Sequence, residues 1–222
     1  RLKALNISKY NNFDIDLEGP DPGYVLVVDQ TVGDASLQGA GVTAFREVLA
    51  FAEIEHPGAP ILLKSHPETI ERKRKGHFQG IPLDARIELF AAPVSPWRLL
   101  EGAVAVYTLS SQLGFEAILA GHRPRVFGQP WYSGWGLTAD EDPVPRRERV
   151  LTRAQLFAAA MILYPVWYDP CRDRLCEIED LIDHMEAALR AYREDRHGGV
   201  ATCMRLWKRP HLKKFFGSEG RL

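Results

Sequence analysis

The sequence predicts an α/β fold of the Rossmann-like type, in which helices cover both faces of a parallel sheet. Short β-rich runs alternate with helical patterns from Tyr24 to Phe127, and these runs are almost continuously apolar. This combination is typical of parallel strands that are buried on both sides. The chain has 222 residues, of which 45% are hydrophobic, so it has enough apolar material for one globular core.

The expected elements follow one another in a regular order. Strands are predicted at Tyr24–Asp29, Ile61–Ser65, Arg86–Phe90, Val104–Thr108 and Arg125–Phe127, and helices between them at about Val42–Glu55, Pro67–Lys75, Pro96–Glu101 and Gln112–Ala120. After Gly128 the strand rhythm ends, and an aromatic, proline-rich loop is expected over Gln129–Arg146. Two helices are then predicted, at about Thr152–Leu163 and Cys176–Tyr192, and the apolar residues of the second recur with the helical period, at Ile178, Leu181, Ile182, Met185, Leu189 and Tyr192.

The domain organisation predicted from this pattern has four parts. Residues 1–22 have weak periodicity and start at Arg1 rather than Met, so we interpret them as a linker from a missing domain. Residues 23–165 are expected to form the nucleotide-binding domain, and residues 166–197 a C-terminal crossing helix. Residues 198–222 begin at Gly198-Gly199, which ends that helix, and form a basic, aromatic tail or linker centred on Arg205–Phe216.

Composition excludes several classes of function. The net charge of −1 gives no global attraction to nucleic acid or to an anionic membrane. The three cysteines, an odd number without metal-ligand spacing, indicate a reducing compartment. No apolar run approaches the ~18 residues that a membrane span requires. We therefore expect a cytoplasmic chain, with at most peripheral contact at the inner membrane.

Two nucleotide-binding motifs are also missing from the sequence. There is no G-x-x-x-x-G-K-[ST] loop and no G-x-G-x-x-G after the first strand. Their absence argues against an NTPase and against a dinucleotide-dependent dehydrogenase. The acidic stretch Asp140-Glu141-Asp142 has oxygen ligands for a divalent metal, but the prolines that follow favour a polar loop, so we expect no metal site.

Polar residues follow the first predicted strand, where a doubly wound sheet binds its ligands. Gly33 permits a tight turn that holds Asp34 at the sheet edge, where its carboxylate could act as a nucleophile or a general base. Alternatively, Asp34 and Ser36 only cap the following helix.

The second and third strand ends carry residues suited to an anion. Lys64 and His66 precede Pro67, which suits the first helical position, so free backbone donors would lie beside both side chains. Ser110 or Ser111 could share a hydroxyl between a helix cap and a phosphate, and Glu116 could accept from ribose hydroxyls. The alternative for each is an ordinary capped helix. Together these strand ends predict a site for a nucleoside-phosphate sugar.

The residues also resemble a known family, the KpsC-type capsule polysaccharide β-Kdo transferases and their LipA-like relatives. The similarity spans residues 24 to 195 and is carried by VLVVDQTVGDAS at Val25–Ser36, KSHPE at Lys64–Glu68, Ser110-Ser111 with GFEA at Gly114–Ala117, and WYSGWGLT at Trp131–Thr138. This resemblance implies the nucleotide-binding half of a GT-B glycosyltransferase. It further implies a CMP-Kdo donor, no cofactor or metal, and transfer with retention of configuration to a lipid-linked Kdo chain.

The resemblance also implies roles for individual residues. Asp34 would be the nucleophile that forms a Kdo adduct, and Gln30 would orient it or the donor carboxylate. The CMP phosphate would be held by His66, Ser110 and Ser111, and the ribose by Glu116. Lys64, assigned above from its place at the strand end, is expected to bind the donor nucleotide with them. The sugar pocket would be lined by Ser36, Trp131, Tyr132 and Trp135, although aromatic residues in a long loop also serve to pack that loop against its domain.

The family's members carry an acceptor-binding half before this segment, so the fragment alone could bind donor without transferring it. Other capsule assembly proteins at the inner membrane are further expected partners. Two alternative functions stay open. One is a transferase for another CMP-linked acid sugar such as sialic acid, and the other is a non-catalytic module for capsule polysaccharide assembly or export.

Overall fold

The computed structural model describes residues 1–11, 13–80 and 84–198, and these form two compact units. One unit is Asn6–Leu156, and the other combines Arg1–Leu5 with the described residues from Phe157 to Gly198. These bounds differ from the predicted ones at 22 and 165, because residues 6–22 pack on the first unit. The indole of Trp97 donates to the carbonyl of Ile7 at 2.9 Å, and Ser95 Oγ donates to Asn6 Oδ1 at 2.7 Å.

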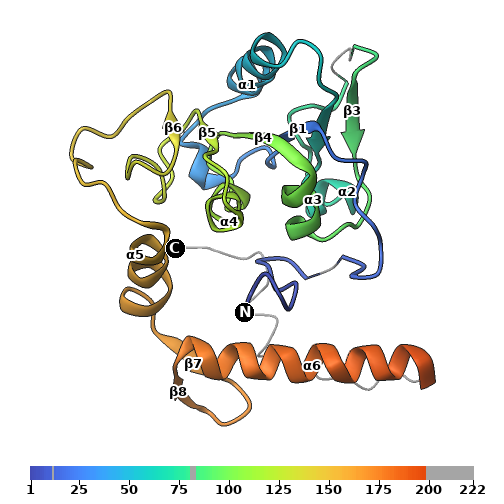
Figure 1. The fold of residues 1–222 in the computed structure, drawn as a ribbon, viewed down its shortest axis with the longest axis vertical. Coiled ribbons are helices and arrows are strands. Elements are labelled where there is room, and N and C mark those ends of the chain that lie inside the picture. Colours follow the sequence, from blue (N-terminus) through green and yellow to red (C-terminus); the bar gives the residue numbers. More distant parts are fainter. Residues whose placement is uncertain (12, 81–83, 199–222) are drawn as a thin grey trace. The chain divides into compact units, whose positions relative to one another are not determined.

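The first unit is built on one six-stranded sheet with the order β3-β2-β1-β4-β5-β6, in which all neighbouring strands are parallel (Figure 1). The strands are β1 (Tyr24–Val28), β2 (Ile61–Lys64), β3 (Ile87–Phe90), β4 (Ala103–Thr108), β5 (Arg125–Val126) and β6 (Ala139–Asp140). The predicted Rossmann-like fold is therefore confirmed. The short strand β6 lies in the segment predicted to be a loop, where it pairs with β5.

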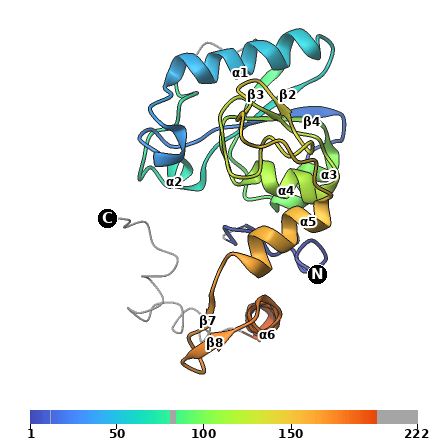
Figure 2. The same cartoon turned by 90° about the vertical axis from the view of Figure 1, so that its left-hand side faces the viewer.

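Helices cover both faces of the sheet (Figures 1 and 2). Helix α1 (Val42–Glu55) lies on one face, and α3 (Pro96–Gly102) and α4 (Leu113–Ala120) lie on the other. Alternate side chains of β1 explain this arrangement: Val25 and Val27 pack in the α1 core with Phe45. Tyr24 points to the opposite face, where its hydroxyl donates to the carbonyl of Leu99 at 2.7 Å.

The helix predicted over Pro67–Lys75 is much shorter in the structure. Helix α2 contains only Pro67–Ile70, and Arg72 adopts a positive φ of 58° that ends any helical path. The following segment turns back and pairs with the loop after β1, where Val32 donates its N–H to the carbonyl of Lys75 at 2.8 Å. Tertiary pairing with that loop outcompetes the helical pattern of the sequence.

The second unit contains the C-terminal elements. Helix α5 (Arg153–Phe157) leads into it and is continued by a π-helical turn, Ala158–Leu163. A hairpin of β7 (Trp167–Asp169) and β8 (Arg174–Cys176), absent from the sequence prediction, precedes α6 (Ile178–Gly198). The start of the predicted apolar stripe is buried, at Ile178 and Ile182. The side chain of Tyr192 and the tail at 199–222 lie outside the described residues.

Within the described part of the chain, no helix combines the length and apolar character that crossing a bilayer would require.

Candidate functional site

The polar strand ends lie where the strand order reverses. Strands β2 and β3 extend the sheet to one side of β1, and β4 to β6 extend it to the other. In doubly wound sheets, ligands bind beyond the carboxyl ends of the strands at this switch point. We call the residues that follow β1, β2 and β4 the strand-end rim.

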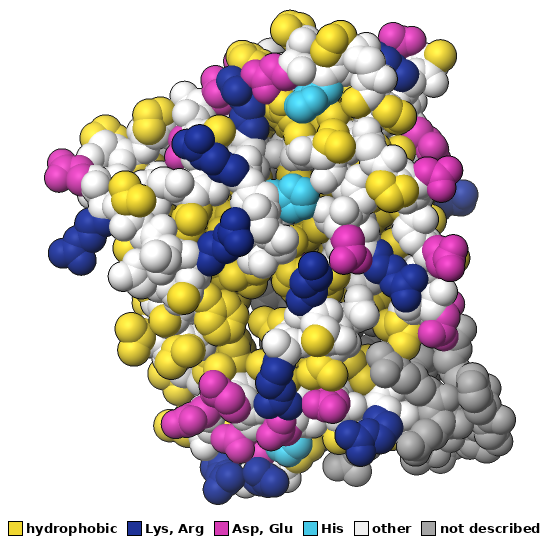
Figure 3. Space-filling view, in the orientation of Figure 1, with side chains coloured by type: hydrophobic (Ala, Val, Ile, Leu, Met, Phe, Trp, Pro, Cys, Tyr) yellow, Lys and Arg dark blue, Asp and Glu magenta, His cyan; other side chains and the backbone are white. Residues whose placement is uncertain are grey.

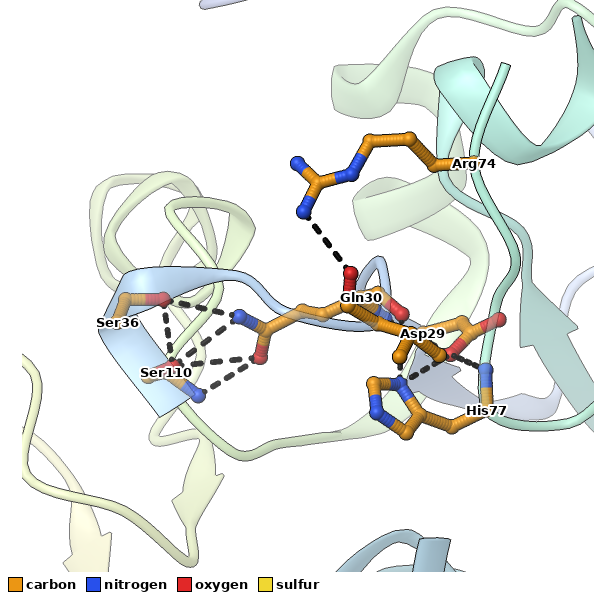
Figure 4. Close-up of polar contacts among 7 residues, drawn as sticks. Asp29, Gln30, Ser36, Arg74, His77 and Ser110 are labelled. Atoms are coloured by element: carbon orange, nitrogen blue, oxygen red, sulfur yellow. Dashed lines mark hydrogen bonds and ion pairs between the residues drawn. The ribbon is translucent and has the colours of Figure 1, made fainter. Parts of the chain in front are cut away.

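Gln30 joins the end of β1 to the end of β4 (Figure 4). Its side-chain oxygen accepts from the N–H of Ser110 at 3.0 Å, and its Nε2 donates to Ser110 Oγ at 3.1 Å and to Ser36 Oγ at 3.2 Å. The two serine hydroxyls also contact each other at 3.0 Å. Gln30 is buried, and these bonds occupy both ends of its amide, so it acts as an internal bridge across the switch point.

Asp34 lies at the exposed end of this network. It caps the short 3-10 helix η1 (Ala35–Leu37), and its Oδ1 accepts from the N–H and the hydroxyl of Ser36, at 2.9 and 2.8 Å. Partial burial alone would raise the pKa of Asp34, but hydrogen bonds from Ser36 and Gln30 and the charge of Lys9 bring this pKa below its usual value. The capping role proposed from sequence is therefore present, and the half-exposed carboxylate stays ionised.

His66 and Lys64 occupy the end of β2. His66 caps α2, and its Nδ1 accepts from the N–H of Glu68 at 3.2 Å. Because Nδ1 is the acceptor, the proton of the neutral ring is on Nε2. Burial lowers the pKa of His66, and the opposing charges of Glu68 and Asp34 do not reverse this. The neutral ring is therefore favoured at pH 7. Burial also lowers the pKa of Lys64 to about 8.

The residues after β4 divide into two roles. The hydroxyl of Ser111 accepts from the N–H of Leu113, the first residue of α4, at 3.3 Å. Glu116, only 7% exposed, does not face open solvent: its Oε1 accepts from Ser8 Oγ at 2.7 Å and from the N–H of Lys9 at 3.2 Å. In this structure Glu116 anchors the N-terminal segment to α4, a contact that the sequence prediction of a ribose ligand did not include.

The aromatic loop packs mainly against the domain. Tyr132 is fully buried, and its hydroxyl donates to the carbonyl of Ser111 at 2.5 Å. Trp131 is 40% exposed and lies against Phe115, with ring centroids 4.6 Å apart. Trp135 donates its indole N–H to the carbonyl of Trp131 at 2.8 Å. Trp131 is thus the aromatic residue of this loop with the largest surface available to a ligand.

Asp29 and His77 contact Gln30 on the side away from Ser36 and Ser110 (Figure 4). Neither residue was assigned to the site from the sequence. Asp29 Oδ1 accepts the N–H groups of Gln30 and His77, at 2.8 and 3.0 Å, and His77 Nδ1 lies 2.8 Å from the carbonyl of Gln30. The His77 ring stacks on Phe45 at 4.0 Å. Gly76 is required here because a Cβ at that position would collide with the Asp29 carboxylate. The sequence signal that could have indicated this role is the acidic residue Asp29 directly after a buried strand.

Basic and acidic side chains are interspersed on the face shown in Figure 3, in keeping with the net charge of −1. Among the described residues, no group of three or more His, Cys, Asp or Glu side chains could hold a metal ion. Within the acidic stretch, Asp140 Oδ2 accepts from the N–H of Gly134 and the hydroxyl of Thr138, both at 3.0 Å. This carboxylate therefore fastens the aromatic loop.

The fold and the rim define a doubly wound α/β domain with polar side chains gathered where such domains bind ligands. Comparison with known proteins gives its family. The family described as "Capsule polysaccharide biosynthesis protein" matches residues 5–166, and the chain belongs to this family. Among curated relatives, the capsule polysaccharide modification protein LipA of Neisseria meningitidis serogroup B is 36% identical over 95% of this chain and 32% of its own length. The lipopolysaccharide-processing protein LpsZ of Rhizobium meliloti is 34% identical over 91% of this chain and 48% of its own.

Solved structures agree with this assignment. The β-Kdo 2,4 transferase of Thermosulfurimonas dismutans KpsC has a TM-score of 0.78 and 37% identity, over 83% of this chain and 59% of that one. The β-Kdo 2,7 transferase of the same KpsC has a TM-score of 0.57 and 26% identity, over 76% of this chain and 55% of that one. The chain is thus of the KpsC and LipA type, and it spans about a third of the length of the LipA relatives and about half of LpsZ.

Proposed function

We propose that this chain is the donor-binding module of a Kdo glycosyltransferase in capsule polysaccharide biosynthesis, using CMP-Kdo and retaining the anomeric configuration. The family, the two Kdo transferase structures and the position of the rim at the switch point support this proposal. The observation that carries it is Asp34, a partly exposed carboxylate that Ser36 holds through Oδ1 at the switch point, next to the Ser110 hydroxyl that Ser36 also contacts.

In the proposed reaction, an oxygen of Asp34 attacks the anomeric carbon of Kdo. The bond from that carbon to the phosphate oxygen breaks, and CMP leaves with the bonding electrons. An acceptor hydroxyl, losing its proton to solvent, then attacks the same carbon and releases the Asp34 carboxylate. Two inversions give net retention. Ser36 holds Oδ1 of Asp34, which leaves Oδ2 as the attacking atom.

The surrounding residues stabilise the leaving phosphate in this proposal. His66 would donate through Nε2, Lys64 would supply positive charge, and the hydroxyls of Ser110 and Ser111 would complete the set of donors. Preorganised donors of this kind lower the barrier by stabilising charge that develops in the transition state. The proposal includes no metal ion or cofactor beyond the donor.

The remaining partners are also part of the proposal. A second, acceptor-binding half in the GT-B arrangement would supply the site for a lipid-linked Kdo chain, which agrees with relatives longer than this chain. The lipid would place the enzyme at the cytoplasmic side of the inner membrane, beside other capsule assembly proteins.

The test is the substitution Asp34→Asn in the complete gene product that contains these residues. We expect transfer from CMP-Kdo to fall by about 10³-fold or more, since a nucleophile is lost. CMP affinity in calorimetry should not fall, because the substitution removes a negative charge near the phosphate. Asp142→Asn is the matched control, because Asp142 is exposed and lies outside the rim. Intact-mass spectrometry with donor and no acceptor should show a Kdo adduct on the wild type and on the control but not on Asp34→Asn.

Normal turnover by Asp34→Asn would exclude the proposed nucleophile. A donor screen separates CMP-Kdo from CMP-sialic acid. If calorimetry detects no binding of CMP or of either donor while capsule glycan binds, the chain is a non-catalytic assembly module instead.

A further inference from the structure

The N-terminal segment Ile7–Tyr10 reaches the strand-end rim from outside the sheet. Glu116, buried in the first turn of α4, accepts from Ser8 Oγ at 2.7 Å and from the backbone N–H of Lys9 at 3.2 Å. The carbonyl of Ile7 accepts from the indole of Trp97 at 2.9 Å. These bonds use backbone and short side-chain groups, so they fix the path of the segment without involving the ammonium of Lys9.

Tyr10 connects this segment to His66. The Tyr10 ring meets the His66 ring edge to face, with centroids 5.4 Å apart, and the Lys9 ammonium lies 5.0 Å from the centroid of the Tyr10 ring. A cation over an aromatic face gains a modest attraction while it stays hydrated. Lys9 is therefore exposed and lies at the Tyr10 ring, which in turn contacts the histidine of the rim.

The charge of Lys9 acts on three rim residues from three different elements. It contributes to lowering the pKa of Asp34 and of His66, and it opposes the rise in the pKa of Glu116 that burial causes. Among the described residues, however, no carboxylate lies within ion-pair distance of the Lys9 ammonium. The ammonium at the Tyr10 ring therefore keeps hydrogen-bond donors available to a ligand.

A cation near Asp34 would offset the repulsion between this carboxylate and the anionic donor of the proposed reaction. Asp34 is an anion, and a nucleotide-linked acid sugar brings a phosphate and a carboxylate toward it. Because like charges repel, donor binding would weaken unless nearby positive charge offsets the repulsion. Lys64 lies at the end of β2, half-buried, whereas Lys9 is exposed and its charge acts on both Asp34 and His66.

We propose that Lys9 is a donor-binding residue, presented by the Glu116 anchor and by Tyr10, and that it binds an anionic oxygen group of the donor, either its phosphate or its sugar carboxylate. This inference rests on the proposed function and adds a binding group from outside the predicted rim. It also gives the Ile7–Tyr10 segment a role in recognition, where sequence reasoning treated residues 1–22 as a linker.

The test compares Lys9→Gln, Lys9→Arg and the control Lys73→Gln by calorimetry with cytidine, CMP and CMP-Kdo. Lys73 is exposed and pairs only with Glu71 in the described structure, so its loss should leave every affinity unchanged. Lys9→Gln should weaken binding of at least one charged ligand about 10-fold, the low end for a lost charge-assisted hydrogen bond. It should leave cytidine binding unchanged, and Lys9→Arg should restore most of the affinity.

The three ligands identify the group that Lys9 binds. Equal weakening of CMP and CMP-Kdo assigns the phosphate, and weakening of CMP-Kdo alone assigns the sugar carboxylate; both support the inference. The salt dependence of the affected affinity should also become shallower in Lys9→Gln. Unchanged affinities for all ligands in Lys9→Gln, when the wild type binds CMP, overturn the role of Lys9 alone. If the wild type binds neither CMP nor CMP-Kdo, the proposed function fails and this inference fails with it.

Discussion

The substitution Gly114→Ala tests how the aromatic loop is fastened to α4. Gly114 is the second residue of that helix, where alanine would ordinarily be favoured by about 1 kcal/mol. In this structure a Cβ at position 114 would fall within 3.0 Å of the hydroxyl, Cζ and Cε2 of Tyr132. Tyr132 is 0% exposed, so its ring has no open space into which it could move.

The expected loss of stability follows from these contacts. Overpacking a filled core costs about 1–3 kcal/mol, and breaking the bond from the Tyr132 hydroxyl to Ser111 costs about 1–3 kcal/mol more. After subtracting the gain in helix propensity of about 1 kcal/mol, we expect the free energy of unfolding to fall by roughly 1–5 kcal/mol. Urea denaturation followed by far-UV circular dichroism measures this change.

Gly58→Ala is the matched control for this experiment. Nothing lies within 4 Å of a Cβ built at Gly58, and its φ is not positive. We expect a change within about 1 kcal/mol, in the stabilising direction, because alanine restricts the unfolded chain. If Gly114→Ala proves as stable as Gly58→Ala, the close packing of Tyr132 against α4 is refuted.

Three further predictions concern charges and the support of the rim. Burial lowers the pKa of Lys64 from 10.5 to about 8, so between these pH values the unfolded chain binds one more proton than the folded chain, and the free energy of unfolding should rise with pH. Lys64→Met should abolish that rise and increase the free energy of unfolding at pH 7 by up to about 3 kcal/mol. Urea titrations that show no difference between the variant and the wild type would contradict this. His77→Phe loses the donor to the carbonyl of Gln30 and should lower the free energy of unfolding, measured by thermal unfolding, by about 1–3 kcal/mol. His77→Asn keeps a donor there and should lower it by less. Equal losses in the two variants would argue against this hydrogen bond. Ser36→Ala removes the hydrogen bond from the Ser36 hydroxyl to Asp34 and keeps the one from the backbone N–H, so the pKa of that carboxyl should rise and the loss of its charge should shift to higher pH. An unchanged ¹³C NMR titration of Asp34 would refute the role of this hydroxyl.

Much of the rim could be predicted because its residues lie close to strand ends in the sequence. Apolar runs bounded by turns predict strands, and parallel strands place their carboxyl ends at one edge of a sheet. Asp34, His66 and Ser110 could therefore be assigned to one edge without coordinates. The net charge depends only on amino-acid composition, and the absence of the two nucleotide-binding motifs depends only on the order of residues in the chain.

Other features required the tertiary structure because they join residues far apart in the chain. Gln30 bonds Ser110 across 80 positions, and Ser8 bonds Glu116 across 108, and no local pattern encodes either pair. The helix predicted after Pro67 shortened to four residues because backbone pairing with the β1 loop satisfied the same polar groups.

The sequence by itself determined the fold class, the strand ends that carry polar residues and the absence of two nucleotide-binding motifs. Only the tertiary structure decided which polar groups are consumed in holding the rim together and which stay available to a ligand. The physical reason is that hydrogen-bond partners are set by proximity in space, whereas hydrophobic periodicity and turn chemistry are set by neighbours along the chain.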